Sequence, residues 1–166
     1  LGYKISRITV AKYMRELGLK SKLSKKFKVT TDSKHNYLLV ENVLNRQFLV
    51  SQPEKALVSD ITYIHTKEGF LYLTTIMDLY DRKIIGWSLS DGMSTNETTL
   101  ASWKMAIKNR NIETGLIFHY DRGVQYANNK FANVLESYKV TRSMSRKGNC
   151  WDNAVAESFF KSLKTE

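Results

Sequence analysis

The sequence predicts an α/β fold in which helices flank a mixed five-stranded sheet, with a separate helix and a basic segment in front of it. Three observations predict this fold. Dense runs of β-branched and aromatic residues begin at residue 56, they later alternate with segments of helical periodicity, and the resulting order is β-β-β-α-β-α-β-α. Strands joined by short turns form antiparallel pairs, whereas strands joined through a helix pair in parallel. The sheet is therefore expected to be mixed.

Local patterns define the expected elements of this core. Turn residues at 68–69 and 81–82 divide the first apolar stretch into three strands. Ser94 or Thr95 is the expected N-cap of the first core helix, because a Ser or Thr oxygen can accept a hydrogen bond from an otherwise unpaired helical N–H. The expected elements are strands 56–66, 70–80 and 83–90, helix 95–110, strand 116–120, helix 129–138, strand 140–145 and a helix from Asp152 or Asn153 to the end.

The beginning of the chain predicts a short amphipathic helix over 6–17, followed by Gly18 as a stop signal. Lys12 and Arg15 lie off its apolar stripe, where they could meet phosphates. A helix of this length is marginal alone, so we interpret residues 1–19 as the last helix of a domain whose beginning is missing. The apolar stripe consists of Val10, Tyr13, Met14 and Leu17.

Residues 20–55 are interpreted as a basic linker with weak local structure, and residues 56–166 as the core. The chain begins without methionine and stops inside an expected helix, which suggests a fragment. The lysines of the linker that we expect to bind DNA are Lys22, Lys25, Lys26 and Lys28.

Composition and charge narrow the function. The chain has 166 residues, and 26 basic against 16 acidic side chains give a net charge of +10. Residues 1–50 contain 11 of the basic and three of the acidic side chains, which favours a polyanion such as nucleic acid as the partner. One cysteine and three histidines exclude a disulfide framework and a zinc finger. No apolar run could span a bilayer, so we expect a cytoplasmic protein that is not bound to a membrane.

Three carboxylates are candidates for catalysis. Asp60 lies within an apolar strand, where a charge is costly unless it is paired or bound to a cation. Asp121 ends the fourth strand, a position at which open α/β sheets place ligand-contacting groups. Glu157 lies near the start of the last helix, on a polar face that it shares with Lys161 and Lys164.

Each carboxylate also has a simpler explanation. Asp60 could be bonded to local backbone, Asp121 could cap the turn before Gly123, and Glu157 could pair with Lys161 on the helix surface. Taken together, the three carboxylates form an oxygen-only donor set, which favours Mg²⁺, or Mn²⁺ as a substitute, over zinc. Two such ions would neutralise the carboxylates and support a displacement at phosphorus, so a phosphodiester is the expected substrate.

The spacing of these carboxylates matches the DDE signature of retroviral-type integrases and bacterial insertion-sequence transposases. Sixty residues lie between Asp60 and Asp121, and 35 between Asp121 and Glu157. From about residue 6 to 166, the chain resembles the second-frame (OrfB-type) transposases of one large insertion-sequence family. The matching segments are VSDITYI at 58–64, HYDRGVQY at 119–126, SMSRKGNCWDNA at 143–154 and ESFF at 157–160.

The resemblance implies an RNase H-like catalytic core that cleaves and joins DNA with two Mg²⁺ ions held by Asp60, Asp121 and Glu157. It implies that Lys161 and Lys164 contact DNA ends, and that the first helix closes a helix-turn-helix segment. The implied partners are double-stranded DNA (the terminal repeats of the element and the target), further copies of the chain, and an upstream-frame protein of the same element. The implied location is the bacterial nucleoid.

Two other functions remain open from the sequence. An RNase H-class nuclease would use the same carboxylate chemistry on hybrids or junctions without needing the basic segment in front. A DNA-binding remnant of a decayed transposase would occupy DNA ends without cutting them, and the abrupt ends of the chain agree with that alternative.

Overall fold

The structure is a computed structural model that describes residues 5–19 and 36–165. It divides into two compact units, one over Leu1–Val29 with Thr165–Glu166 and one over Thr30–Lys164. The linker lysines Lys22, Lys25, Lys26 and Lys28 lie outside the described residues. None of the helices in the described ranges has the length and hydrophobicity needed to cross a membrane.

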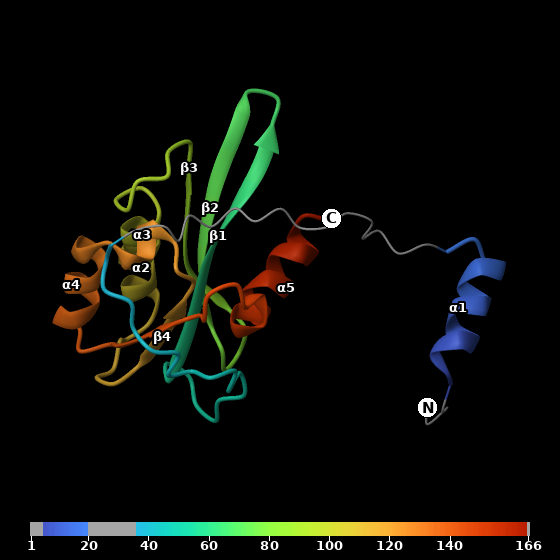
Figure 1. Ribbon diagram of the computed structural model, residues 1–166, viewed down its shortest axis with the longest axis horizontal. Helices are drawn as coiled ribbons and strands as arrows, with labels where there is room; N and C mark the ends of the chain where they lie inside the picture. The colour runs from blue at the N-terminus through green and yellow to red at the C-terminus, as the bar shows by residue number, and fades with distance from the viewer. Residues whose placement is uncertain (1–4, 20–35, 166) are drawn as a thin grey trace. The chain divides into compact units, whose positions relative to one another are not determined.

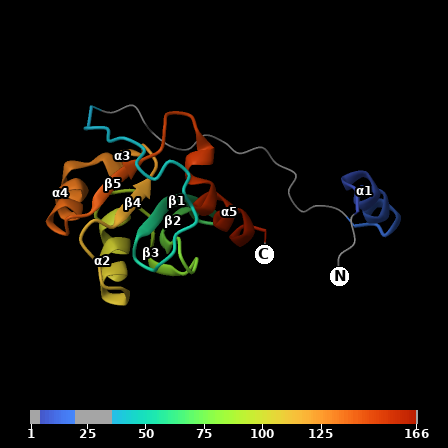
Figure 2. The same ribbon diagram turned by 90° about the horizontal axis from the view of Figure 1, so that it is seen from below.

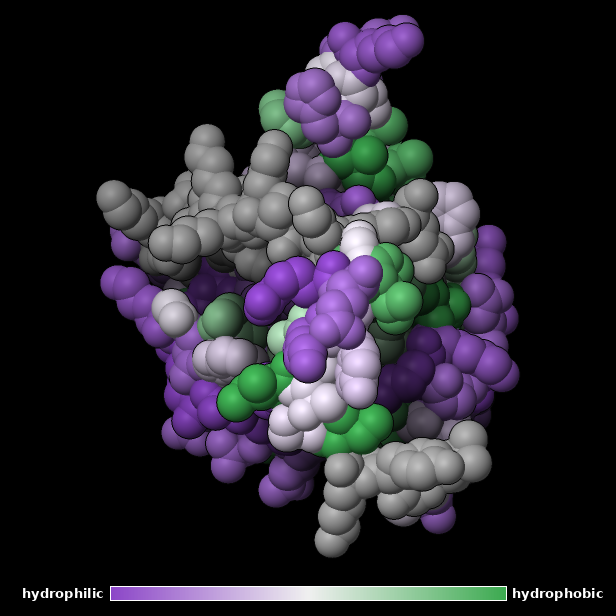
Figure 3. Space-filling model, turned by 90° about the vertical axis from the view of Figure 1, so that its right-hand side faces the viewer, coloured by the Kyte–Doolittle hydropathy of each residue, from purple (hydrophilic) through white to green (hydrophobic). Residues whose placement is uncertain are grey.

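The first unit contains helix α1, Arg7–Glu16, as predicted. It begins at Ser6, whose Oγ accepts a hydrogen bond from the Thr9 N–H at 3.1 Å. Gly18 follows the C-cap residue Leu17 with a φ of +66°, which glycine adopts easily, and the Leu19 N–H bonds back to the Met14 carbonyl oxygen at 2.7 Å. The described residues of α1 include no buried side chain. In the space-filling view of Figure 3, apolar and hydrophilic side chains are intermixed.

The second unit is built on a five-stranded mixed sheet in the order β3-β2-β1-β4-β5. The first three strands pair antiparallel, and β4 and β5 extend the sheet from β1 in parallel, which confirms the predicted arrangement. The strands are β1 Ala56–Thr66, β2 Gly69–Asp78, β3 Ile84–Ser90, β4 Ile117–Tyr120 and β5 Thr141–Met144.

The core helices differ from the prediction in a few details. α2 begins four residues later than expected, because Ser94 and Glu97 form a reciprocal cap on the turn before the helix and not on the helix itself. A four-residue helix after β4 and a 3-10 turn before the last helix were not predicted. The helices are α2 Thr99–Asn109, α3 Val124–Ala127, α4 Asn129–Ser137, η1 Cys150–Asn153 and α5 Ala154–Leu163.

Helices cover both faces of the sheet and enclose a core on each (Figures 1 and 2). On the face of α2 and α4, Trp103, Phe118 and Phe131 are fully buried and their rings meet edge to face. Gly86 allows α2 to approach β3 closely, since a Cβ there would collide with the Ser102 carbonyl oxygen. On the other face, Val58 of β1 and Ala156 of α5 belong to a second apolar cluster.

Residues 36–55 have no helix or strand, in agreement with weak local structure, but they pack against the core. Leu44 is 2% exposed within the cluster beneath α5. Its N–H donates to Ser143 Oγ at 3.0 Å, and the Glu41 carbonyl oxygen accepts from the Met144 N–H at 3.2 Å. This part of the predicted linker is therefore held along β5.

Candidate active site

Asp60 and Asp121 lie level with each other on neighbouring strands. β1 and β4 pair in parallel with Val58 opposite His119. Two residues further in the same register, Asp60 falls opposite Asp121, which directly follows β4. Because adjacent strands are about 4.8 Å apart and residues in register share a face, the two carboxylates meet at this end of the sheet.

Glu157 approaches the same place from α5. The Asn153 side-chain amide donates a hydrogen bond to the Ser59 carbonyl oxygen at 3.0 Å, which fixes the start of α5 beside the residue that precedes Asp60. Glu157 lies one helical turn after Asn153, in the first turn of α5. The predicted last helix begins later than Asp152 or Asn153, because the Asn153 side chain bonds to β1 and makes no cap.

Electrostatic effects link the three carboxylates. The pKa of Asp60 is raised well above its usual value, first by burial and then by the negative charges of Asp121 and Glu157. Burial also raises the pKa of Glu157, although that side chain is largely exposed at the surface. The positive charge of Lys164 acts on Asp60 in the opposite direction. These four groups therefore lie within electrostatic reach of one another.

The local backbone hydrogen bonds that could by themselves explain Asp60 and Asp121 are also present. The Ile61 N–H donates to Asp60 Oδ1 at 2.8 Å, and the Gly123 N–H donates to Asp121 Oδ1 at 2.8 Å. A carboxylate can accept about four hydrogen bonds. The backbone therefore orients both carboxylates and leaves lone pairs for a further ligand.

A buried tyrosine contacts Ser59, the residue before Asp60. Tyr126 is 1% exposed, and its hydroxyl lies 2.7 Å from Ser59 Oγ, which in turn donates to the Thr75 carbonyl oxygen at 2.8 Å. Burial, and then the charge of Asp60, raise the pKa of Tyr126 well above its usual value.

The chemistry of this donor set fits a hard divalent cation. The carboxylates supply only oxygen ligands, and a cation would offset the mutual repulsion that raises the pKa of Asp60. Within the described ranges, no three His, Cys, Asp or Glu side chains are already arranged to hold a metal ion. Asp60, Asp121 and Glu157 are the residues that would hold it.

The basic residues predicted to bind DNA are found in separate places. Lys161 and Lys164 lie at α5, four and seven residues after Glu157, and both are exposed. Burial lowers the pKa of Lys164, with the charge of Asp60 acting against this shift. Lys12 and Arg15 lie on α1, where Lys12 Nζ is 3.8 Å from a carboxylate oxygen of Glu16.

Comparison with known proteins gives the family. The model of the integrase core domain family matches residues 50–150. The chain belongs to the integrase core domain family. Its relatives include a transposase, InsF of insertion sequence IS3A from Escherichia coli (strain K12), which is 41% identical over 165 residues, or 99% of this chain and 57% of the relative. The insertion element IS600 uncharacterized 31 kDa protein from Shigella sonnei is 40% identical over 99% of this chain and 60% of its own length. The chain thus spans less than two thirds of these relatives.

Solved structures show that the integrase core of this chain has the RNase H-like fold. One similar structure is the simian T-cell lymphotropic virus intasome in complex with the PP2A regulatory subunit B56 gamma. The match covers 78% of this chain and 44% of the intasome chain, with a TM-score of 0.63 and 18% sequence identity. The HTLV-2 integrase catalytic core domain, solved with magnesium, matches 68% of both chains with a TM-score of 0.56 and 18% identity. The predicted fold class is confirmed.

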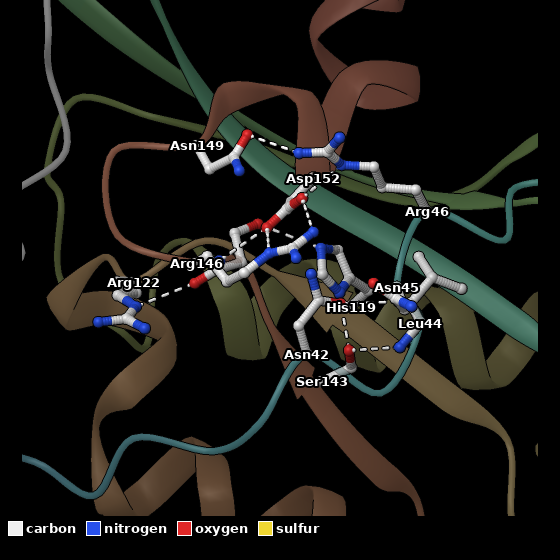
Figure 4. Close-up of polar contacts among 11 residues, drawn as sticks. Asn42, Leu44, Asn45, Arg46, His119, Arg122, Ser143, Arg146, Asn149 and Asp152 are labelled. Carbon is white, nitrogen blue, oxygen red and sulfur yellow. Dashed lines mark hydrogen bonds and ion pairs between the residues drawn. The ribbon is translucent and has the colours of Figure 1, made fainter.

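Sequence reasoning missed a buried ion-pair cluster beside the carboxylates of the integrase core. Local sequence suggests that Asp152 is a turn or cap residue, but it is 0% exposed and accepts hydrogen bonds from Arg46 and Arg146 (Figure 4). These bonds lower the pKa of Asp152 far below its usual value, with those from Arg146 contributing most. The segment 143–154 placed Asp152 and Arg146 near each other, but no sequence signal indicated Arg46.

His119 lies in the same region of the integrase core and is also fully buried. Its Nδ1 is 2.8 Å from Ser143 Oγ and its Nε2 is 3.1 Å from Ser145 Oγ, so both ring nitrogens have hydroxyl partners. Burial lowers the pKa of His119 to about 4. The histidine is therefore neutral at physiological pH and ties β4 to β5.

A cavity of about 530 Å³ opens between residues 39–45 and the ends of β4 and β5. Arg122 and Arg146 line it together with Glu41. Arg146 is paired with Asp152, and the Arg122 Nε donates to the Ser145 carbonyl oxygen at 2.9 Å.

Proposed function

We propose that this chain is the catalytic domain of a DDE transposase that cleaves DNA at the ends of an insertion sequence and joins them to target DNA. The observation that supports this most directly is geometric: the register of β1 and β4 brings Asp60 level with Asp121, and the bond from Asn153 to Ser59 fixes the start of α5, the helix that carries Glu157, beside them. Membership of the integrase core family and the relatedness to an insertion-sequence transposase agree with the proposal.

In this proposal Asp60, Asp121 and Glu157 hold two Mg²⁺ ions, which Mn²⁺ could replace. When bound, the ions would activate an attacking oxygen and stabilise a leaving oxygen in a displacement at phosphorus. The protein's own part is to hold the carboxylates oriented toward one another. Because the pKa of Asp60 is raised, protons compete with cations for this carboxylate, and cleavage should increase as the pH rises through that pKa.

Basic residues would hold the DNA. Lys164 is near Asp60 and follows Lys161 on α5, so both would place positive charge beside a phosphodiester at the carboxylates. We propose that Lys12, Arg15 and the four linker lysines bind further phosphates of double-stranded DNA outside the core. Neutralising the four lysines should reduce the slope of log K against log salt by about 0.9 for each phosphate that a lysine no longer neutralises. An unchanged slope would make this segment a spacer.

The wider organisation is part of the same proposal. Residues 1–19 would close a helix-turn-helix segment, 20–55 would form a basic linker, and 56–166 would form the catalytic core. The protein would act as a homo-oligomer on DNA in the bacterial nucleoid, with an upstream-frame protein of the element as a further partner. The similarity to a chain of an intasome supports assembly on DNA.

A strand-transfer assay tests the function. The chain is incubated with Mg²⁺ and labelled duplexes that carry the terminal repeats of the element, and parallel reactions contain RNA–DNA hybrids. We expect cleaved and joined duplex products. Cutting of hybrids alone would identify an RNase H-class nuclease, and salt-sensitive binding without turnover would identify a DNA-binding remnant; either result would reject the proposal.

A further inference from the structure

The carboxylate of Asp152 is held by two arginines from different parts of the chain. Its Oδ1 accepts from Arg46 Nε and Arg146 Nη2, both at 2.7 Å. Its Oδ2 accepts from the Arg146 N–H at 2.9 Å and from Arg146 Nε at 2.8 Å. Figure 4 shows both guanidinium groups directed at this carboxylate. Asp152 is five residues before Glu157, within the 3-10 turn η1 that leads into α5.

Arg46, which precedes β1 in the chain, binds the loop between β5 and α5 at two positions. Its Nη2 donates to Asn149 Oδ1 at 2.9 Å, while its Nε bonds to Asp152, so one side chain joins two positions of this loop. The backbone that carries Arg46 is fixed, because Leu44 is buried in the core and the Asn45 N–H donates to Asn42 Oδ1 at 2.8 Å. A fixed arginine of the preceding segment thus restrains the loop.

The restraint extends to the carboxylate site. Asp152 is followed directly by Asn153, whose amide bonds to Ser59 next to Asp60. Glu157 lies one helical turn further along α5. Breaking the hydrogen bond between Arg46 and Asp152 would therefore remove one restraint on the end of the helix that carries Glu157 and leave those from Arg146 and Ser59.

We propose that Arg46 is a positioning residue for Glu157 that acts through Asp152 and Asn149. Through this interaction, the segment before the core governs the geometry of the carboxylate site. The inference rests on the proposed function of that site. Arg46 lies upstream of residues 50–150, which match the family, so this control is supplied by a part of the chain outside the matched domain.

A positioning role predicts that kinetics change more than stability. The Arg46 side chain is 43% exposed, and ion pairs with an exposed partner contribute little to the free energy of unfolding. In contrast, a misplacement of about 1 Å at a reacting centre can cost on the order of a hundredfold in rate. The variant should remain folded and lose turnover.

The chain offers a matched control for Arg46. Arg82 is also exposed, also has a left-handed backbone (φ of +60° against +64° for Arg46), and also holds the segment before the core, through a 2.8 Å bond from its Nη2 to the Phe48 carbonyl oxygen. Replacing either arginine with glutamine removes one positive charge and its hydrogen bonds, with similar backbone strain. Only Arg46 touches Asp152 and Asn149.

The experiment compares R46Q, R82Q and the unchanged chain over residues 1–166. Strand cleavage is measured against DNA and Mg²⁺ concentration, and Mn²⁺ binding is measured by electron paramagnetic resonance. For R46Q we expect kcat to fall by about tenfold or more, KM for DNA to stay within about twofold, and Mn²⁺ binding to weaken. R82Q should match the unchanged chain. Equal kcat and equal Mn²⁺ binding in the two variants would overturn the proposal.

Hydrogen exchange separates this inference from the proposed function. Without metal or DNA, R46Q should increase amide exchange over 149–157 by about tenfold relative to R82Q. If the unchanged chain neither cleaves DNA nor binds Mn²⁺, the proposed function fails, and exchange still decides whether Arg46 holds the loop. Unchanged exchange over 149–157 would overturn the positioning role in either case.

Discussion

Asp60 and Asp152 are both aspartates at the same end of one sheet, and their surroundings have opposite effects. Burial, and then the charges of Asp121 and Glu157, raise the pKa of Asp60 well above the usual value. Asp152 is fully buried but receives four hydrogen bonds from two arginines, and its pKa is lowered.

The difference between them lies in where each carboxylate finds its positive charge. Asp152 is neutralised by the protein itself, so it can serve as a fixed structural element. Asp60 is only partly compensated, by Lys164, and its remaining charge favours a cation from outside the protein. Burial alone therefore does not tell a structural aspartate from a metal-binding one; the identity of the neighbours does.

The largest effect expected on the carboxylate site is the loss of cleavage in D121N. The substitution removes one anionic ligand from the site and should abolish strand cleavage, while salt-sensitive DNA binding persists. The assay is cleavage of labelled terminal repeats, with binding followed by fluorescence anisotropy. D91N, at an exposed position, changes the charge equally and should cleave normally. Normal cleavage by D121N would show that the site is misassigned.

For Asp152, in contrast to Asp60, replacement by asparagine (D152N) should destabilise the protein. Two arginines would lose their carboxylate, and we expect a loss of about 2 kcal/mol, below the value for a fully buried pair because both arginines are half exposed. The lowered pKa means that this stabilisation is fully present at neutral pH and is lost only as the pH falls below the usual range of an aspartate. Urea unfolding at pH 7 measures it. An unchanged midpoint would contradict the assignment of Asp152 as a structural anchor.

His119, buried next to the Asp152 cluster, should make stability depend on pH. Its folded-state pKa of about 4 lies below the unfolded value near 6.5. The unfolded chain therefore binds the proton first, and the free energy of unfolding should fall as the pH decreases from 6.5 towards 4, by up to about 1.4 kcal/mol per pH unit. H119N should lack this contribution when the two proteins are compared by urea unfolding across that range. If the free energies of unfolding of the two proteins change equally with pH, His119 does not have the lowered pKa.

The smallest expected effect is a gain in stability for D60N, the opposite sign from D152N. Because the pKa of Asp60 is raised, its ionised form costs free energy in the folded protein at neutral pH. Removing that charge should raise Tm at pH 7 by a few degrees, and the gain should shrink as the pH falls towards the usual aspartate pKa. Mg²⁺ should also reduce the gain, because it stabilises only the unchanged site. A lower Tm for D60N at pH 7 would mean that Asp60 is satisfied by the protein, as Asp152 is.

Local sequence patterns predicted most of the fold. The limits of β1 were predicted to the residue, because its β-branched and aromatic run is bounded by turn residues. The start of α2 was misplaced because Ser94 and Glu97 form a cap that local reasoning assigns to the helix, whereas the structure uses it for the preceding turn. The four residues of α3 are too few for a periodic signal.

The sequence by itself determined the order of strands and helices and the candidate carboxylates, because periodicity, turn chemistry and motif spacing are properties of neighbouring residues. The tertiary structure alone decided which positive charges these carboxylates meet. Arg46 and Asp152 are 106 positions apart, and Asn153 and Ser59 are 94 apart. Such contacts depend on how the segment before the core and α5 pack against the sheet, and no local pattern encodes that packing.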